Sequence, residues 1–211
     1  MLTDVRAVAI IILGAGLYGA SLGLWRGPGQ AAMNAIKFPL LITLVVAGNA
    51  ALNGMLAMVM GAPLSFRQTY RAILLSMVIL ALVLGSLTPV SLALWFNAPP
   101  LGSEDTGLGY ALIMVAHVFL IALAGVTANV RLYGALRGAC RDDSRLALRV
   151  LVAWLAGNLL LGSQLSWNLR PFIGSPELET QFFREDAFSG NFFEALHRQG
   201  LNLIHRETRH D

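Results

Sequence analysis

The residues best suited to do chemistry lie in a short stretch, 163–176, where the sequence changes from leucine-rich to amide-rich and then reaches an Arg-Pro pair. Amide, hydroxyl, indole and guanidinium groups donate and accept hydrogen bonds, which suits them to bind a partner. The candidate interaction residues are Gln164, Ser166, Trp167, Asn168 and Arg170. A helix end explains the indole, the arginine and the following proline without any ligand, because indoles favour the membrane interface and proline ends a helix. It does not explain Gln164, Ser166 and Asn168 together, so a partner is expected there first.

Four further polar residues fall inside long apolar runs: Asn49, Asn53, His117 and Asn158. An ionisable or amide side chain at membrane depth is a functional candidate by default. The alternative is that each hydrogen-bonds across a helix interface and holds two helices together. The two interpretations differ in geometry, since a transport path needs the four side chains to converge on one solvated cavity.

Catalytic constellations are sparse. All twelve acidic residues lie outside the expected membrane spans, which leaves no buried carboxylate pair. The run Gly14-Ala15-Gly16-Leu17-Tyr18-Gly19 matches a dinucleotide-binding fingerprint, but that motif needs an acidic residue about 20 positions later, and none occurs between Asp4 and Glu104. The single cysteine, Cys140, allows no intramolecular disulfide and is expected to be a surface thiol. We therefore expect no catalytic residue, no metal site and no cofactor.

The composition indicates whether this chain lies in water or in lipid. Apolar residues make up 56% of the 211 residues and charged residues 13%, with a mean hydropathy of +0.64. Soluble domains carry about 25% charged residues, so this chain is expected in lipid. The basic residues sit between apolar runs rather than in one patch, which argues against nucleic acid as a partner. The sequence predicts an all-α membrane protein with about five spans, at 7–25, 38–60, 72–96, 108–130 and 150–167.

The first run is rich in small residues. Ala15, Gly19 and Gly23 recur every four positions, which places them on one helix face where another helix can approach closely. The partner helix belongs either to this chain or to a second copy. The run lacks a small-residue cleavage pattern, so it is expected to stay on the protein, either as a span or as a re-entrant helix.

Several boundaries follow from turn residues and charge. We expect residues 26–37 to form a turn and a short amphipathic piece, and Pro89 to kink the third span. The run Asp142-Asp143-Ser144 is expected to cap the start of the fifth span. Eight arginines share one side of the membrane if the Arg-rich loop at 131–149 is cytoplasmic, which puts the amino terminus inside and the tail outside. The chain then divides into a transmembrane domain, 1–169, and an extracytoplasmic tail, 170–211. Helix starts are expected in that tail at Ser175 and Asn191, with an amphipathic character beyond.

The stretch 163–176 resembles a family of uncharacterised bacterial polytopic inner-membrane proteins. Further matching segments are Phe182-Phe183-Arg184, Gly190-Asn191-Phe192-Phe193, Tyr18-Gly19-Ala20, Gln30-Ala31-Ala32 and Ala35-Ile36-Lys37-Phe38-Pro39-Leu40-Leu41. Span count and loops are also loosely similar to Yip-type five-span proteins. The resemblance implies a multi-pass protein of the bacterial inner membrane and leaves its function open.

Two functions remain open. The first is a non-enzymatic membrane subunit, such as a scaffold, sensor or assembly factor, that acts through its tail or its Arg-rich loop. Its partners would be the lipid bilayer and another membrane or periplasmic protein, or a second copy of itself. The alternative is a small transporter or channel for a neutral or lipid-like substrate, with the four intramembrane polar residues along its path.

Overall fold

The computed structural model describes residues 3–174 and 179–194. The helices are α1 (Asp4–Gly23), α2 (Pro28–Val59), α3 (Phe66–Ser86), α4 (Thr88–Asn97), α5 (Thr106–Ala139) and α6 (Ser144–Leu169), and the described residues contain no strand. Five of them, α1, α2, α3, α5 and α6, are long and apolar enough to cross a membrane. The chain is therefore an all-α, multi-pass membrane protein, as its sequence predicts.

The expected separate piece at 26–37 is instead the beginning of α2. Gly27 adopts φ 127° and Pro28 opens the helix, where its missing N–H costs nothing because first-turn N–H groups have no partner within the helix. The helix then continues through the internal Pro39 to Val59. The prediction of a break before residue 38 was wrong because proline at a first-turn position starts a helix.

The predicted kink near Pro89 is confirmed and is a complete break. Helix α3 begins at a capping box, in which Ser65 and Gln68 satisfy each other's backbone N–H groups, and it ends at Ser86. After Leu87 the chain starts the short helix α4 with proline in its first turn. The third apolar run is thus two helices.

The turn between α5 and α6 spans only residues 140–143, so the stretch 131–149, expected as an Arg-rich loop, is mostly helix. Asp143 caps α6 by accepting hydrogen bonds from the backbone N–H groups of Arg145 and Leu146, each at 3.0 Å, which confirms the predicted cap. Cys140 is 2% exposed and packs in the core, so the expectation of a surface thiol was wrong. Burial raises the pKa of this thiol, and the charge of Asp143 raises it further.

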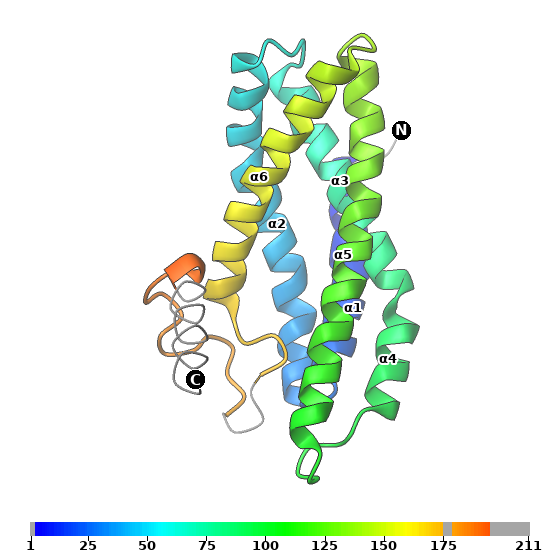
Figure 1. Ribbon diagram of the computed structural model, residues 1–211, viewed down its shortest axis with the longest axis vertical. Helices are drawn as coiled ribbons and strands as arrows, with labels where there is room; N and C mark the ends of the chain where they lie inside the picture. Colours follow the sequence, from blue (N-terminus) through cyan, green and yellow to red (C-terminus); the bar gives the residue numbers. More distant parts are fainter. Residues whose placement is uncertain (1–2, 175–178, 195–211) are drawn as a thin grey trace, which may run out of the picture.

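The long helices pack side by side and alternate in direction, so that α1 and α6 both run toward the end of the bundle where the tail lies (Figure 1). The α2–α3 and α5–α6 turns lie at the opposite end, as does the start of α1. That end therefore collects the eight arginines near helix ends: Arg6, Arg67, Arg71, Arg131, Arg137, Arg141, Arg145 and Arg149. Helix α1 is one uninterrupted helix of 20 residues with buried side chains along its length, and it has the form of a span rather than a re-entrant helix.

The described part of the tail consists of residues 170–174 and 179–194. Asn191 Oδ1 accepts a hydrogen bond from the Glu194 backbone N–H at 2.8 Å, which confirms the predicted helix start there. The start expected at Ser175 and the amphipathic stretch expected beyond residue 194 lie outside the described residues.

Candidate functional site

Three polar side chains share one face of α2 where that helix meets the tail. Gln30, Asn34 and Lys37 are spaced by four and three residues, which places them on the same side of a helix. Their exposed fractions are 1%, 0% and 0%. Polar groups buried in apolar surroundings need hydrogen-bond partners to offset their lost hydration. Their partners therefore identify what this end of the bundle holds.

The two amides hold the chain segment that follows α6. Gln30 Nε2 donates to the carbonyls of Pro171 and Phe172, each at 2.9 Å. Asn34 Nδ2 donates to the same Phe172 carbonyl at 2.6 Å. Gln30 Nε2 also contacts Asn34 Oδ1 at 3.0 Å, which fixes the orientation of both amides. Backbone groups that would otherwise be unpaired are thus satisfied by side chains of a helix some 140 positions earlier.

Lys37, the one lysine of the chain, completes this contact. Its Nζ donates to the Pro171 carbonyl at 2.8 Å and lies 3.5 Å from the Gln181 carbonyl. The ammonium also lies 5.9 Å from the ring centre of Phe172 and 5.0 Å from that of Phe182, within range of a cation–π interaction. A cation held by carbonyls and aromatic faces ties together two separate passes of the tail, at 171–172 and at 181–182. We name the segment 170–194, as far as it is described, the tail platform.

The predicted amides at the end of α6 bind the tail platform from the other side. Gln164 Nε2 donates to Asn168 Oδ1 at 3.1 Å, and Gln164 Oε1 accepts from the Phe192 backbone N–H at 3.3 Å. The first partner of these amides is therefore the protein's own tail. Ser166 turns toward a cavity between the helices instead.

Arg170 fastens the same junction. Its guanidinium lies 3.6 Å from the Trp167 ring centre and donates to the Trp167 carbonyl at 2.8 Å. It also forms an ion pair with Asp186 at 2.9 Å. Partial burial opposes ionisation of that carboxyl, but the hydrogen bond and charge of Arg170 prevail and hold the pKa of Asp186 below its ordinary value. Trp167 and Arg170 thus pack against each other, and Arg170 connects both to the tail.

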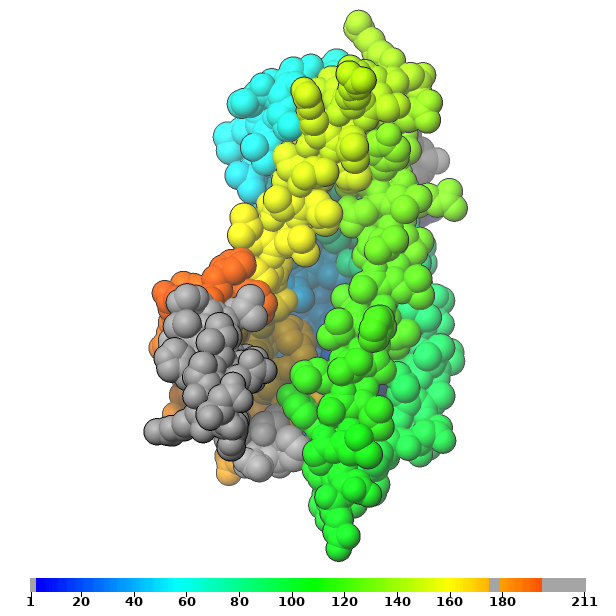
Figure 2. All heavy atoms as spheres, in the orientation of Figure 1, coloured from blue at the N-terminus to red at the C-terminus, as the bar shows by residue number. Residues whose placement is uncertain are grey.

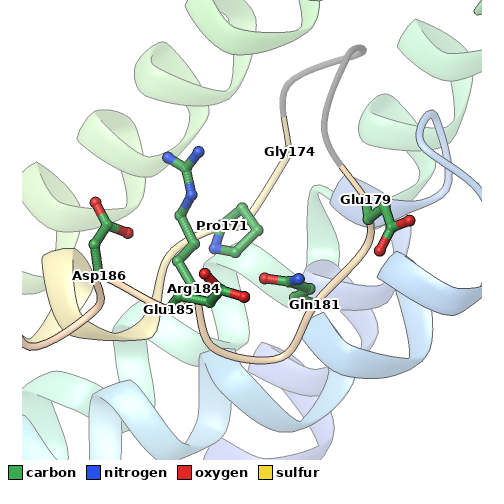
Figure 3. Close-up of a pocket in the computed structure, with 7 residues that line it drawn as sticks. All are labelled: Pro171, Gly174, Glu179, Gln181, Arg184, Glu185 and Asp186. Carbon is green, nitrogen blue, oxygen red and sulfur yellow. The ribbon is translucent and has the colours of Figure 1, made fainter.

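The tail platform forms an open pocket of about 410 Å³ (Figure 3). Two passes of the chain line it, the turn after α6 and the segment 179–186. The lining residues are Pro171, Gly174, Glu179, Gln181, Arg184, Glu185 and Asp186. Charges of both signs face a space of the size that proteins use for small ligands and peptide side chains.

The three predicted asparagines lie together between α2 and α6. Asn53 Nδ2 contacts Asn158 Oδ1 at 3.4 Å, and Trp154 Nε1 donates to the Asn53 carbonyl at 2.9 Å. A Cβ on Gly157 would lie 3.3 Å from Asn53 Oδ1 and 3.4 Å from Asn49 Oδ1, so glycine lets the helices approach. The amide of Asn49 has no hydrogen-bond partner within the described residues.

His117 lies in a different place, buried where α1, α4 and α5 meet. Its Nδ1 donates to the Ile113 carbonyl at 2.7 Å, so the neutral ring accepts through Nε2 from Ser91 Oγ at 2.9 Å. Ser91 in turn contacts Ser21 Oγ at 2.9 Å. The predicted alternative of a histidine bonded across a helix interface is confirmed at this position. The four intramembrane polar residues therefore fall into two separate clusters.

The small residues of α1 pack within the chain. Ala15 is fully buried. A Cβ on Gly19 would overlap the Asn34 carbonyl of α2, and one on Gly23 would lie 2.7 Å from the backbone of Gln30 and Ala31. The partner helix of the Gly19 and Gly23 face is thus α2, at the turns that carry the buried amides.

Sequence reasoning missed Gln30, Asn34 and Lys37 as site residues, as well as Ser21 and Ser91. A signal for the first three existed: polar residues at positions i, i+4 and i+7 of an otherwise apolar segment share a helix face. Nothing in the sequence signals the pairing of Ser91 with His117.

Comparison with known proteins adds no relative: no family model, no curated protein and no solved structure matches this chain. Its place among bacterial inner-membrane proteins stays a prediction from the motifs of 163–176.

Proposed function

We propose that the protein is a non-enzymatic subunit of the bacterial inner membrane that binds a partner protein through its tail platform. The observation that carries the proposal is the buried set Gln30, Asn34 and Lys37, which holds the platform against α2 through five side-chain contacts with backbone carbonyls. A surface loop needs no such anchoring. A binding surface gains from it, because preorganisation lowers the entropy lost on association.

The surface of the platform fits a protein partner. Phe183, Phe188 and Phe193 are 44%, 77% and 45% exposed, and the mixed-charge pocket lies on the same segment. Exposed aromatic side chains beside polar groups are typical of the energetic centres of protein interfaces. The partner would be another membrane or periplasmic protein, or a second copy.

Transport and hydrolysis receive less support. Asn53 pairs with Asn158 at the α2–α6 interface, and His117 pairs with Ser91 at a second interface, which is the scattered pairing expected of structural hydrogen bonds. Ser91 Oγ and His117 Nε2 lie 2.9 Å apart, as a serine nucleophile and its base would. However, the two residues are only 0% and 3% exposed. A substrate would have no route to that hydroxyl.

The orientation is part of the proposal. Eight arginines at one end of the bundle support a cytoplasmic location for that end, with the tail platform on the periplasmic side. The partner would then be met outside the cytoplasm.

The test is site-specific photocrosslinking in the native membrane. A photoreactive residue replaces Phe188 on the platform, and a matched one replaces Phe119, a lipid-facing phenylalanine of α5 that is 71% exposed. A defined protein adduct from position 188 and not from 119 is expected. Adducts with lipid alone from both positions would contradict the proposal.

A further inference from the structure

Helices α5 and α6 diverge from one another and leave a hollow with α2 at its floor (Figure 2). Two cavities occupy this region, an outer one of about 640 Å³ and an inner one of about 220 Å³. They share the lining residues Leu80, Gly125, Asn129, Leu155 and Leu159, so they adjoin one another, and the inner one reaches α2. We name the two together the lateral groove. Its walls are apolar except for Asn129, Asn158, Ser166 and the Tyr133 hydroxyl.

The length of the groove matches one leaflet of a bilayer. Along α6 the outer cavity runs from Leu148 to Leu159, and along α5 from Tyr133 to Ile121. At a rise of about 1.5 Å per residue these stretches are roughly 16–18 Å long. Half of a hydrocarbon core of about 30 Å is about 15 Å. A chain lying in the groove would therefore extend from the Arg-rich end to the middle of the membrane.

Arginines flank the Arg-rich end of the groove on both helices. Arg137 follows Tyr133 by four residues and Arg145 precedes Leu148 by three, which places each one turn beyond the groove on its lining face. Within the described residues the carboxylate that pairs with either of them is Asp142, 3.5 Å from Arg137 in an exposed, weak pair. The nearby Asp143 is engaged in capping α6. Stretch 131–149 holds five arginines against these two aspartates.

We propose that the lateral groove binds an anionic phospholipid, with an acyl chain along α5 and α6 and the headgroup phosphate between Arg137 and Arg145. Guanidinium groups bind phosphate oxygens in a bidentate manner, and basic pockets between membrane helices are recognised sites for anionic headgroups. A partner helix fits less well. One turn of a helix about 10 Å wide occupies about 400 Å³, so the outer cavity would hold only a turn and a half.

The experiment uses the full chain, purified in detergent and mixed with dioleoyl phosphatidylglycerol or, separately, dioleoyl phosphatidylcholine. Native mass spectrometry counts the lipids retained. Gly125→Phe tests the acyl site, because a side chain there enters open space inside the groove. Gly134→Phe is the matched control on the same helix: its added side chain also meets open space, but Gly134 does not line the groove.

We expect the unaltered chain to retain one phosphatidylglycerol and to prefer it over phosphatidylcholine. Gly125→Phe should lower retention by about tenfold or more and Gly134→Phe should leave it unchanged. The double variant Arg137→Gln and Arg145→Gln should lower phosphatidylglycerol affinity by about tenfold or more while sparing the weaker phosphatidylcholine signal. Arg67→Gln with Arg71→Gln, at the same end but on α3, is its control.

Equal retention of the two lipids, or equal retention by the two glycine variants, would overturn the proposal. The proposal would also be overturned if a membrane protein copurified in equal amount with the unaltered chain and was lost from Gly125→Phe. The groove would then hold a helix of that partner. If Gly125→Phe fails to fold, Gly125→Leu with Gly134→Leu repeats the comparison with a smaller side chain, and the arginine arm tests the headgroup independently.

Discussion

At the scale of single residues, the junction between the bundle and its tail depends on a few buried donors. Gln30, Asn34 and Lys37 each direct nitrogen atoms at carbonyls of the segment after α6. The shortest of these contacts is from Asn34 Nδ2 to the Phe172 carbonyl, at 2.6 Å. In an apolar environment such a bond is costly to lose, since the carbonyl cannot turn to water.

Substituting Asn34→Leu tests this anchor. The change keeps the approximate volume but removes the donor to Phe172 and the acceptor for Gln30. We expect a loss of about 1–3 kcal/mol in the free energy of unfolding and faster proteolysis within the tail platform. Denaturant unfolding of the purified protein and limited trypsin digestion measure the two effects.

The control is Asn97→Leu, because Asn97 is exposed and its amide bonds only to its own helix at Ala93. Its effect should lie within about 0.5 kcal/mol. Equal effects of the two substitutions would show that the Asn34 amide is not an anchor.

At the scale of elements, the close approach of α1 and α2 supports the same anchor. Gly19 lies against the Asn34 carbonyl, and Gly23 lies against the backbone of Gln30 and Ala31. The turns of α2 that carry the buried amides are therefore fixed by α1. Small residues on α1 and polar residues on α2 act as one unit.

Gly19→Ala is expected to destabilise the protein, because its methyl group would overlap the backbone of α2. Forced separation of two packed helices costs about 1–3 kcal/mol. Gly134→Ala on α5 meets no neighbour and should be neutral or stabilising by up to about 1 kcal/mol through helix propensity. Thermal unfolding of both variants measures the difference, and an equal shift in both would contradict the packing argument.

At the scale of the whole molecule, charge divides the two ends of the bundle. Eight of the fourteen arginines gather at the end that holds the α2–α3 and α5–α6 turns, and the tail platform lies at the other end (Figure 1). Under the positive-inside rule, this asymmetry supports our proposal that the tail lies on the outer side.

Thiol labelling tests that orientation in cells of a Cys140→Ser background. A thiol at Ser189, exposed on the tail platform, is expected to react with a membrane-impermeant maleimide applied from outside. One at Ser144, exposed at the start of α6, is expected to react only after permeabilisation. If Ser189→Cys reacted only from the cytoplasmic side, the proposed orientation would be wrong.

Much of the architecture could be predicted from local sequence. The apolar runs gave the five spans, Pro89 the break after α3, Asp143 the cap of α6 and Asn191 the helix start in the tail. Each depends on residues within a turn of one another, so periodicity and capping chemistry suffice. The error at 26–37 also concerns local sequence. A proline can either end a helix or start one, and the local pattern did not show that Pro28 starts α2.

The site was predictable only in part. Within 163–176, Gln164 and Arg170 bind the tail directly, and Asn168 bonds to Gln164. Their counterparts on α2 were missed because the contact joins positions about 140 residues apart, and no local pattern encodes such a pairing. The burial of Cys140 was missed for the same reason.

By itself the sequence determined the five apolar helices, their order and the positions of the arginines between them. Hydropathy and helix period are properties of consecutive residues, so local sequence is enough to set these features. The tertiary structure decided which polar groups meet. It paired α2 with the tail, separated His117 from the asparagines, and left α5 and α6 apart to form the lateral groove. Side-chain packing between distant segments sets those outcomes, and the order of residues does not show it.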